Sequence, residues 1–377
     1  MQRREFLAGS AAGLSGLFLS SGQPLALPKK KILIRGAYSS PETFWKKGAR
    51  LDEYGINALF IHSGSLKEEL IRRARSEGAR VFAEFATLNG SGWLTRREGE
   101  RELPIAEHEA AWPIDQTGQP SPRQTWHLGV CPTNEALISA RLEELKRLVT
   151  KLPLDGVWLD YLHWHAQFED PRPRLPETCF NESCVSRFQR EKSVAVQGTK
   201  PEDWARDILQ NHEKQWRQWR CSILVDFARR CREVLRTHAP NMLLGNFHCA
   251  WRDEEYGGAR QRILGLDLQA LAGVFDVMSP MLYHARSGHP SSWVEQNVSW
   301  LCKKLGVQGT REERLKIWPI VQAWSDPEGA KVNAGDFETV LRGGGAAGAT
   351  GVMMFTLGSV AEDEAKMAVL KKVYAEL

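Results

Sequence analysis

The stretch "DGVWLDYLHWH", residues 155–165, combines the pattern of a buried strand with the residues of a reactive site. Val157, Trp158 and Leu159 form an apolar run that ends on Asp160, and tyrosine, histidine and tryptophan residues follow directly. A continuous apolar run is typical of a parallel strand that is covered on both faces. The stretch therefore predicts a buried sheet with functional side chains at the carboxyl ends of its strands.

Runs of this kind recur along the chain and alternate with segments of helical periodicity. The predicted strands are residues 31–38, 57–64, 80–86, 156–162, 242–248, 275–284, 316–324 and 351–358. Eight such β–α units predict an α/β protein with a (β/α)₈ barrel, formed by one domain over residues 29–377. Two insertions, 87–132 and 163–200, follow the third and fourth strands, on the side where barrel enzymes build their active sites.

The first 28 residues are predicted to be an export signal. Arg3 and Arg4 precede Phe6 and Leu7, and a modest apolar stretch follows to about Leu19. This order resembles the bacterial twin-arginine signal. The apolar stretch is too short and too rich in glycine and serine for a permanent membrane span. We expect the twin-arginine export machinery to deliver the protein to the periplasm or the medium.

The charge balance of the chain argues against a nucleic-acid partner. The net charge is +4 and the isoelectric point is about 8.6, which is only mildly basic. The one tight basic run, Lys29 to Lys31, is explained by a solvated segment before the first strand.

Two carboxylates decide the predicted chemistry. Glu84 and Asp160 lie toward the ends of the third and fourth strands, which are neighbours about 5 Å apart in a sheet. Such a pair can act as nucleophile or base and as general acid in glycosidic bond cleavage, if one carboxyl stays protonated near neutral pH. An alternative is an ion pair between Glu84 and Arg35. The loop acids Asp253, Glu254 and Glu169 are other possible partners of Asp160.

Further polar and aromatic residues at the strand ends are predicted to bind substrate. The chain has fourteen tryptophans, and flat apolar rings with a polar edge suit the faces of sugars. The predicted substrate-binding residues are Arg35, His62, Asn89, Trp93, His163, Trp164, His165, Asn246, His248, Tyr283, Gln322 and Trp324.

No metal or other cofactor is expected at the mouth of the barrel. His163 and His165 with Asp160 offer zinc-type ligands, but the first strand lacks the His-x-His pair common in barrel metallohydrolases. No dinucleotide fingerprint occurs between a strand and a helix.

The strand-four segment, continued by "FEDPRPRLPETCFNESCVSRF", resembles a largely uncharacterised bacterial group of glycoside-hydrolase-like barrels. In that group an Asp-Gly-x-x-x-Asp-Tyr strand precedes a Cys-Phe-Cys-x-x-Cys segment, and "FIHSGS", "EFATLNG" and "CPTN" are similar too. The resemblance implies a (β/α)₈ fold and carbohydrate hydrolysis, with Asp160 at a catalytic position and Glu84 in the matching "EFATLNG" segment. Here Asn181 replaces the middle cysteine, so we expect a Cys179–Cys184 disulfide or two free thiols instead of a three-thiolate metal site.

The sequence thus predicts an exported glycoside hydrolase that acts on a poly- or oligosaccharide by a two-carboxylate mechanism. Two alternatives remain, a carbohydrate-binding barrel without catalysis and a metal-dependent hydrolase.

Overall fold

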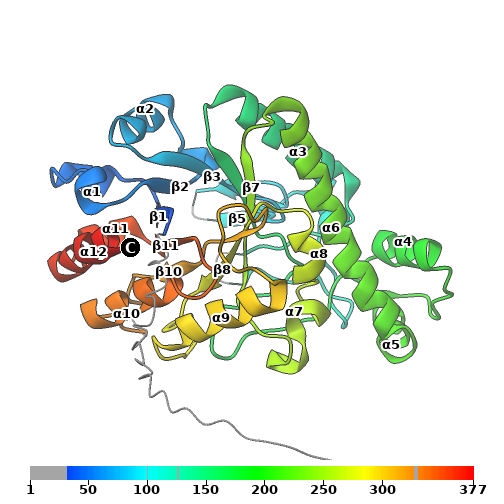
Figure 1. Cartoon of the computed structure of the whole chain (residues 1–377). Helices are drawn as coiled ribbons and strands as arrows, with labels where there is room; N and C mark the ends of the chain where they lie inside the picture. Colours follow the sequence, from blue (N-terminus) through cyan, green and yellow to red (C-terminus); the bar gives the residue numbers. More distant parts are fainter. Residues whose placement is uncertain (1–31, 100, 125–126, 327–329) are drawn as a thin grey trace, which may run out of the picture. The chain divides into compact units, whose positions relative to one another are not determined.

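A computed structural model shows a closed barrel of eight parallel strand positions surrounded by helices (Figure 1). It describes residues 32–99, 101–124, 127–326 and 330–377, so the predicted export signal lies outside the described residues. Strands are hydrogen-bonded in the order β10–β11–β1–β2–β3–β6–β7–β8, and pairing of β8 with β10 closes the cylinder. The predicted (β/α)₈ barrel is confirmed.

The barrel strands coincide with the apolar runs of the sequence. They are β1 (Ile34–Tyr38), β2 (Ala58–His62), β3 (Arg80–Ala86), β6 (Gly156–Asp160), β7 (Leu243–Cys249), β8 (Val277–Leu282), β9 (Lys316–Ile317) with β10 (Ile320–Gln322), and β11 (Gly351–Phe355). The seventh position is split because Pro319 has no N–H for the ladder. There β9 pairs with β8 alone, whereas β10 pairs with β8 and β11.

Helices cover the outside of the strands (Figure 1). They are α1 (Glu42–Lys46), α2 (Glu68–Ser76), α3 (Glu135–Lys151), α4 (Glu182–Lys192), α5 (Pro201–Asn211), α6 (Glu213–His238), α7 (Ala259–Arg262), α8 (Leu268–Ala272), α9 (Trp293–Leu305), α10 (Ala334–Gly344), α11 (Leu357–Ala361) and α12 (Glu364–Glu376). Within the described ranges, no helix is both long enough and apolar enough to cross a membrane.

Large aromatic side chains fill the lower interior of the barrel. Phe82 packs against Phe60 and Trp158 with ring centroids 4.8 Å apart in both cases, and Trp158 stacks on Trp318 at 5.5 Å. Gly245 of β7 makes room for them, because a Cβ atom there would lie 2.3 Å from the Trp158 ring. These rings, the aromatic floor, close the barrel below the strand ends.

The two insertions fold over the carboxyl ends of the strands. The first contains a hairpin of β4 (Thr95–Glu98) and β5 (Arg101–Pro104), which the sequence analysis did not predict. The insertions are joined by a bridge between Asp115 and Thr178 and by a bond from Phe180 N–H to the Ile114 carbonyl at 2.9 Å. They therefore form a common structure around the mouth.

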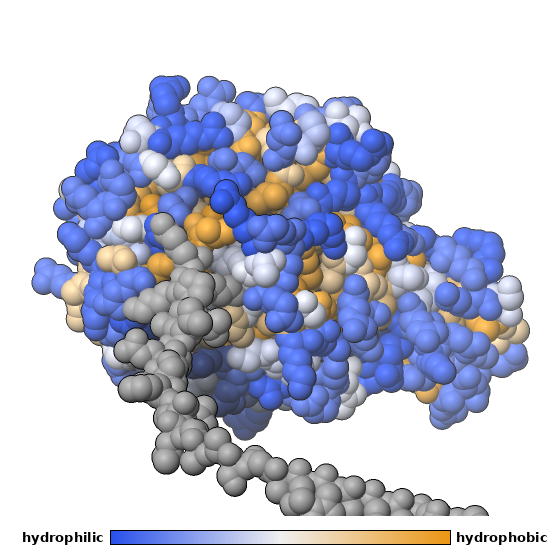
Figure 2. Space-filling model, viewed as in Figure 1, coloured by the Kyte–Doolittle hydropathy of each residue, from blue (hydrophilic) through white to orange (hydrophobic). Residues whose placement is uncertain are grey.

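The surface of the described residues is mainly hydrophilic. Figure 2 shows apolar residues on this face mostly as narrow stretches between hydrophilic ones. Leu33 and Tyr256 are the large apolar side chains that the described part of the chain leaves exposed. These two residues do not form a broad apolar patch.

Candidate active site

Three carboxyl groups meet at the mouth of the barrel, above the aromatic floor. Side chains alternate along a strand, so Glu84 faces inward like Phe82, and Asp160 faces inward like Trp158. Ala86, not Glu84, is the register partner of Asp160, which places Glu84 one layer deeper. Glu169 comes from the second insertion and reaches the same space.

Glu84, in β3, is 2% exposed, and its carboxyl group lies near residues at the ends of β1 and β2. Its Oε2 accepts a hydrogen bond from the Tyr38 hydroxyl at 3.2 Å and lies 4.0 Å from His62 Nε2, while its Oε1 is buried without a partner. Burial raises the pKa of Glu84 to about 7, against the opposing effect of the Tyr38 hydrogen bond.

Asp160 ends β6 and is held by the next residue. Its Oδ1 accepts the backbone N–H of Tyr161 at 2.8 Å. Burial raises the pKa of Asp160 to about 8, and the nearby Glu84 charge raises it further, while the bond from Tyr161 opposes the shift. This bond favours the charged form of Asp160, as the Tyr38 hydroxyl does for Glu84.

Glu169 is 7% exposed, and its Oε2 is buried without a partner. Burial raises its pKa to about 8, with a further increase from Asp160 and an opposing effect of Arg286. Its backbone carbonyl accepts a hydrogen bond from Ser287 Oγ at 3.2 Å, which ties this segment to the loop after β8. The neutral, protonated form of Glu169 is therefore favoured near pH 7.

Asp160 and Glu169 face a small pocket of about 90 Å³. Its other lining residues are Tyr38, His127, Tyr161, His163, Ala166, Gln167, Phe168, Met281, Tyr283 and Phe355. Glu84 is not among them. The pocket is smaller than a usual ligand cavity, which holds about 300–1,000 Å³, so it fits only part of a larger substrate. A hollow of about 850 Å³ between α2 and α3 contains none of the three acids.

His163 presents an acceptor to the pocket. Its Nδ1 donates to the Trp164 carbonyl at 2.8 Å, because a carbonyl oxygen only accepts. Burial lowers the pKa of His163 to about 4, so the ring is neutral and Nε2 carries a lone pair. This nitrogen can accept a hydrogen bond from a substrate hydroxyl.

Several predicted substrate-binding residues do lie at the mouth. Tyr283 lines the pocket and packs against Trp324 and Phe355, with ring centroids 4.9 Å and 5.3 Å away. Asn89 hydrogen-bonds the Tyr161 side chain, and His62 stands at the rim with 56% of its side chain exposed. Gln322 is fully buried and supports the rim by accepting Arg286 N–H at 3.0 Å and donating to the Trp324 carbonyl at 3.1 Å.

Three other residues that were predicted to bind substrate do not point into the mouth of the barrel. Arg35 donates to the carbonyls of Gly55 and Ile32, away from the mouth, so the alternative ion pair with Glu84 is not formed. Asn246 and His248 alternate with the inward Phe247 and therefore lie on the outer side of β7.

Two of the three tryptophans predicted to bind substrate, Trp164 and Trp93, do not line the pocket. Trp164 is fully buried and donates to the Arg220 carbonyl at 3.1 Å. Trp93 stacks on His108 in the first insertion, with ring centroids 4.2 Å apart, and Trp251 is buried. Tyrosine and phenylalanine rings line the pocket instead, while Trp324 stands beside it.

His165 is a structural residue in this arrangement. Its Nδ1 accepts the Gly129 N–H at 2.9 Å, and its Nε2 donates to the Pro122 carbonyl at 3.0 Å. Both ring nitrogens are therefore occupied, which removes His165 from the ligand set expected for a metal-dependent hydrolase. Among the residues that the structure describes, His163, His165 and Asp160 do not bring their ligand atoms together.

Pocket residues that carry no charge or lie in the insertions were not predicted from the sequence. Tyr38 ends β1, and strand alternation could have found it in place of Arg35. His127 lies beside His163, with ring centroids 4.7 Å apart, but no sequence signal placed residue 127 there. Of the alternative acids, Glu169 enters the pocket, whereas Asp253 pairs with Lys304 and Arg260, and Glu254 is exposed.

Comparison with solved structures relates this barrel to glycoside hydrolases. The glycoside hydrolase domain of PgaB (BpsB) from Bordetella bronchiseptica matches with a TM-score of 0.62 and 13% identity, over 90% of this chain and 98% of that one. A β-galactosidase from Halorubrum lacusprofundi matches with a TM-score of 0.64 and 11% identity, over 91% of this chain. One from Bacillus circulans sp. alkalophilus gives 0.63 and 13%, over 93%.

The match to the β-galactosidases covers 58% and 56% of their chains, so this protein corresponds to little more than half of their length. At such low identity the likeness establishes a glycoside-hydrolase-like barrel fold. No protein-family model matches the chain. No curated protein sequence matches it either.

Proposed function

We propose that the protein is a glycoside hydrolase that cleaves a poly- or oligosaccharide at the mouth of its barrel. The observation that carries this proposal is the pair of carboxyl groups on one pocket, half-buried Asp160 and buried Glu169, both with raised pKa values. Hydrolysis of a glycosidic bond needs one carboxylate and one carboxylic acid on either side of the scissile bond. Tyrosine rings and a neutral His163 supply the apolar and polar contacts that a sugar requires.

The surroundings of the two acids suggest separate roles. Asp160 accepts a backbone N–H, which stabilises its charged form, so it acts as nucleophile or base. Glu169 has a buried oxygen without a partner, which favours its protonated form, so it acts as general acid. Asp160 and Glu169 both have a pKa of about 8, so ionisation of one keeps the other protonated, and the hydrogen bond from Tyr161 N–H favours Asp160 as the charged member of the pair.

Glu84, the partner predicted from the sequence, receives a different role in this proposal. It lies outside the pocket lining and one layer below Asp160. Its charge raises the pKa of Asp160. We therefore assign Glu84 as a positioning residue that sets the protonation of Asp160.

Substitution of each acid tests these roles. Hydrolysis of a panel of oligosaccharides and aryl glycosides is measured for the wild type, Asp160→Asn, Glu169→Gln and the control Glu254→Gln, an exposed acid in the loop after β7. We expect kcat/KM to fall by about 10²–10⁴ for the first two variants and to stay unchanged in the control. Full activity of Asp160→Asn would contradict the proposal.

The non-catalytic carbohydrate-binding barrel gives a different result in the same experiment. It predicts binding of an oligosaccharide by the wild type without any hydrolysis. The small volume of the pocket, about 90 Å³, is the observation that keeps this second candidate in view. Calorimetric titration with the same glycans separates the two functions.

Export through the twin-arginine machinery is part of the proposal. It rests on the order Arg3-Arg4-x-Phe6-Leu7 near the start of the chain. Replacement of both arginines by lysine is expected to keep the protein in the cytoplasm of the cells that produce it, as cell fractionation would show. Normal export of that variant would refute this route.

A further inference from the structure

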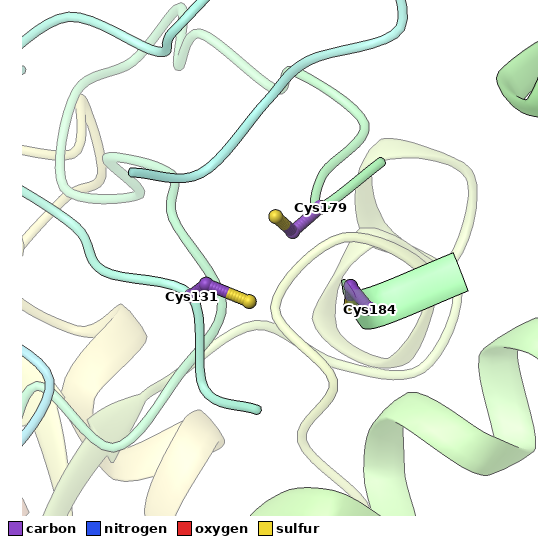
Figure 3. A group of neighbouring side chains, drawn as sticks. All are labelled: Cys131, Cys179 and Cys184. Carbon is purple, nitrogen blue, oxygen red and sulfur yellow. The ribbon is translucent and has the colours of Figure 1, made fainter. Parts of the chain in front are cut away.

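Three buried thiols come together beside the mouth. The sulfur atoms of Cys131, Cys179 and Cys184 all lie within 4.8 Å of one another, and Figure 3 shows the three side chains converging. All three residues are 0% exposed and are free cysteines. We call this group the thiol cluster. Of the two states expected for Cys179 and Cys184, the free thiols are confirmed, and Cys131 joins them although the sequence did not connect it with this pair.

The thiol cluster joins segments that are far apart in the chain. Cys131 ends the first insertion, Cys179 belongs to the second, and Cys184 lies in the first turn of α4. The Cys131 N–H donates to the Ala111 carbonyl at 2.8 Å, which fixes this end of the first insertion. The three sulfur atoms come together without a disulfide between any two of them.

Polar groups lie beside the sulfur atoms. The Ile114 N–H donates to Cys179 Sγ at 3.4 Å, and Thr133 Oγ1 lies 3.1 Å from Cys131 Sγ. Such outer contacts orient metal-binding thiolates and compensate part of their charge. A buried group of three sulfurs with these neighbours is thus suited to a cation, since a buried negative charge needs a partner.

We propose that the thiol cluster binds a soft divalent cation, of which Zn²⁺ is the best fit. Thiolates prefer soft and borderline ions over Mg²⁺ or Ca²⁺. With a Zn–S distance of about 2.3 Å, tetrahedral geometry places sulfur atoms about 3.8 Å apart. Because the sulfur atoms lie within 4.8 Å of one another, each pair of sulfur atoms has to approach by no more than about 1 Å to bind the ion.

The fourth ligand does not come from Asn181, although this residue lies between Cys179 and Cys184. Its Oδ1 accepts the Cys184 N–H at 2.9 Å, and its Nδ2 donates to the Ala110 carbonyl at 3.1 Å. The side chain thus caps α4 and ties it to the first insertion. Three protein ligands leave one position for water or an external ligand.

The proposed ion would stabilise the loops at the mouth. The first insertion also holds His127, and the second holds Glu169, so a bond between the insertions fixes two walls of the pocket. The test of this proposal does not depend on the proposed hydrolase activity, because it measures binding of the ion and not catalysis.

Metal binding by the reduced full-length protein tests the proposal. The wild type is treated with a chelator, separated from it and titrated with Co²⁺, which reports thiolate ligation by a sulfur-to-metal charge-transfer band. We expect one equivalent of Co²⁺ to produce the band, Zn²⁺ to displace it, and Zn²⁺ to raise the midpoint of thermal unfolding. A wild type that folds but develops no such band overturns the proposal, whatever the variants do.

Serine variants locate the site. Cys131→Ser, Cys179→Ser and Cys184→Ser are each expected to weaken Zn²⁺ binding by more than about tenfold, because even outer-shell substitutions cost that much. The control is Cys231→Ser, which alters another fully buried cysteine, in α6. Equal affinity in the wild type and the three cluster variants overturns the assignment. A disulfide between two cluster cysteines in protein loaded with Zn²⁺ does so as well.

Discussion

The charge of Glu84 contributes to the raised pKa of Asp160, so a change at residue 84 can be read at residue 160. The Glu84 carboxylate raises the pKa of Asp160 in addition to the larger effect of burial. Glu84→Gln removes that charge, and we expect the pKa of Asp160 to fall. The Asp160-dependent limb of the pH profile of kcat/KM should then move to lower pH. A profile that keeps its position while its height falls would indicate a merely structural role for Glu84.

His165 and His163 lie two residues apart but have different functions, and alanine substitution should separate them. His165→Ala leaves the buried Gly129 N–H without its acceptor, which costs about 1–3 kcal/mol. We expect a lower free energy of unfolding in urea for this variant. His163→Ala, the matched comparison, should lose more affinity for substrate than stability. Equal stability of the His165 variant and the wild type would contradict the structural assignment.

Strand alternation explains which polar residues could be predicted and which could not. Glu84 and Asp160 were found because each acid interrupts an apolar run near the end of its strand. Arg35, Asn246 and His248 meet the same criterion, yet they point outward, where Arg35 donates to the Gly55 carbonyl. Counting two residues from an inward aromatic, such as Phe247 or Phe82, would have separated these groups.

At the scale of elements, the packing of β7 against the aromatic floor depends on Gly245. A methyl group at this position would lie 2.3 Å from the Trp158 ring. We expect Gly245→Ala to lower the free energy of unfolding by about 1–3 kcal/mol, the usual cost of overpacking. Gly358→Ala in α11 is the control, because its nearest neighbour is 3.8 Å away. Thermal or urea unfolding of both variants gives the comparison, and equal losses would refute the packing argument.

The eight strand positions were predictable because both faces of each strand are buried, which makes the apolar runs continuous. The elements of the insertions were not. Strands β4 and β5 contain charged residues such as Arg96, Arg97 and Glu98 in a solvent-exposed hairpin, so no apolar pattern marks them. The interruption at Pro319 could have been predicted from its missing N–H.

For the whole molecule, the buried acids make stability depend on pH. In the folded state the pKa of Asp160 and of Glu169 is about 8, above the ordinary values of 3.8 and 4.5. The folded protein therefore binds more protons than the unfolded chain, so the free energy of unfolding falls as pH rises toward 8. Buried histidines act in the opposite direction, but only below their ordinary pKa of 6.5.

The informative window is thus pH 7 to 8, above the histidine transition. Urea unfolding of the wild type should show decreasing stability across this window. Asp160→Asn should show a smaller decrease, because the amide does not titrate. Parallel slopes for the two proteins would mean that Asp160 keeps an ordinary pKa in the folded state.

The site as a whole could not be predicted, because it forms from segments that are far apart in the sequence. Glu169 was recognised only as one of several loop acids, and Cys131 was not connected to Cys179 and Cys184. Both assignments depend on how the insertions fold over the barrel, through contacts such as Asp115 with Thr178. Local sequence patterns contain no information on such pairings, whereas the barrel follows from repeated local patterns.

For the proposed hydrolase, the aromatic floor has a kinetic consequence. Since stacked indoles and phenyl rings block passage along the barrel axis, whatever enters must leave by the same opening. A product that is leaving then occupies the mouth of the barrel, through which the next substrate molecule has to enter. Turnover at a site with one opening is expected to slow as product accumulates. A higher substrate concentration should relieve this competitive product inhibition.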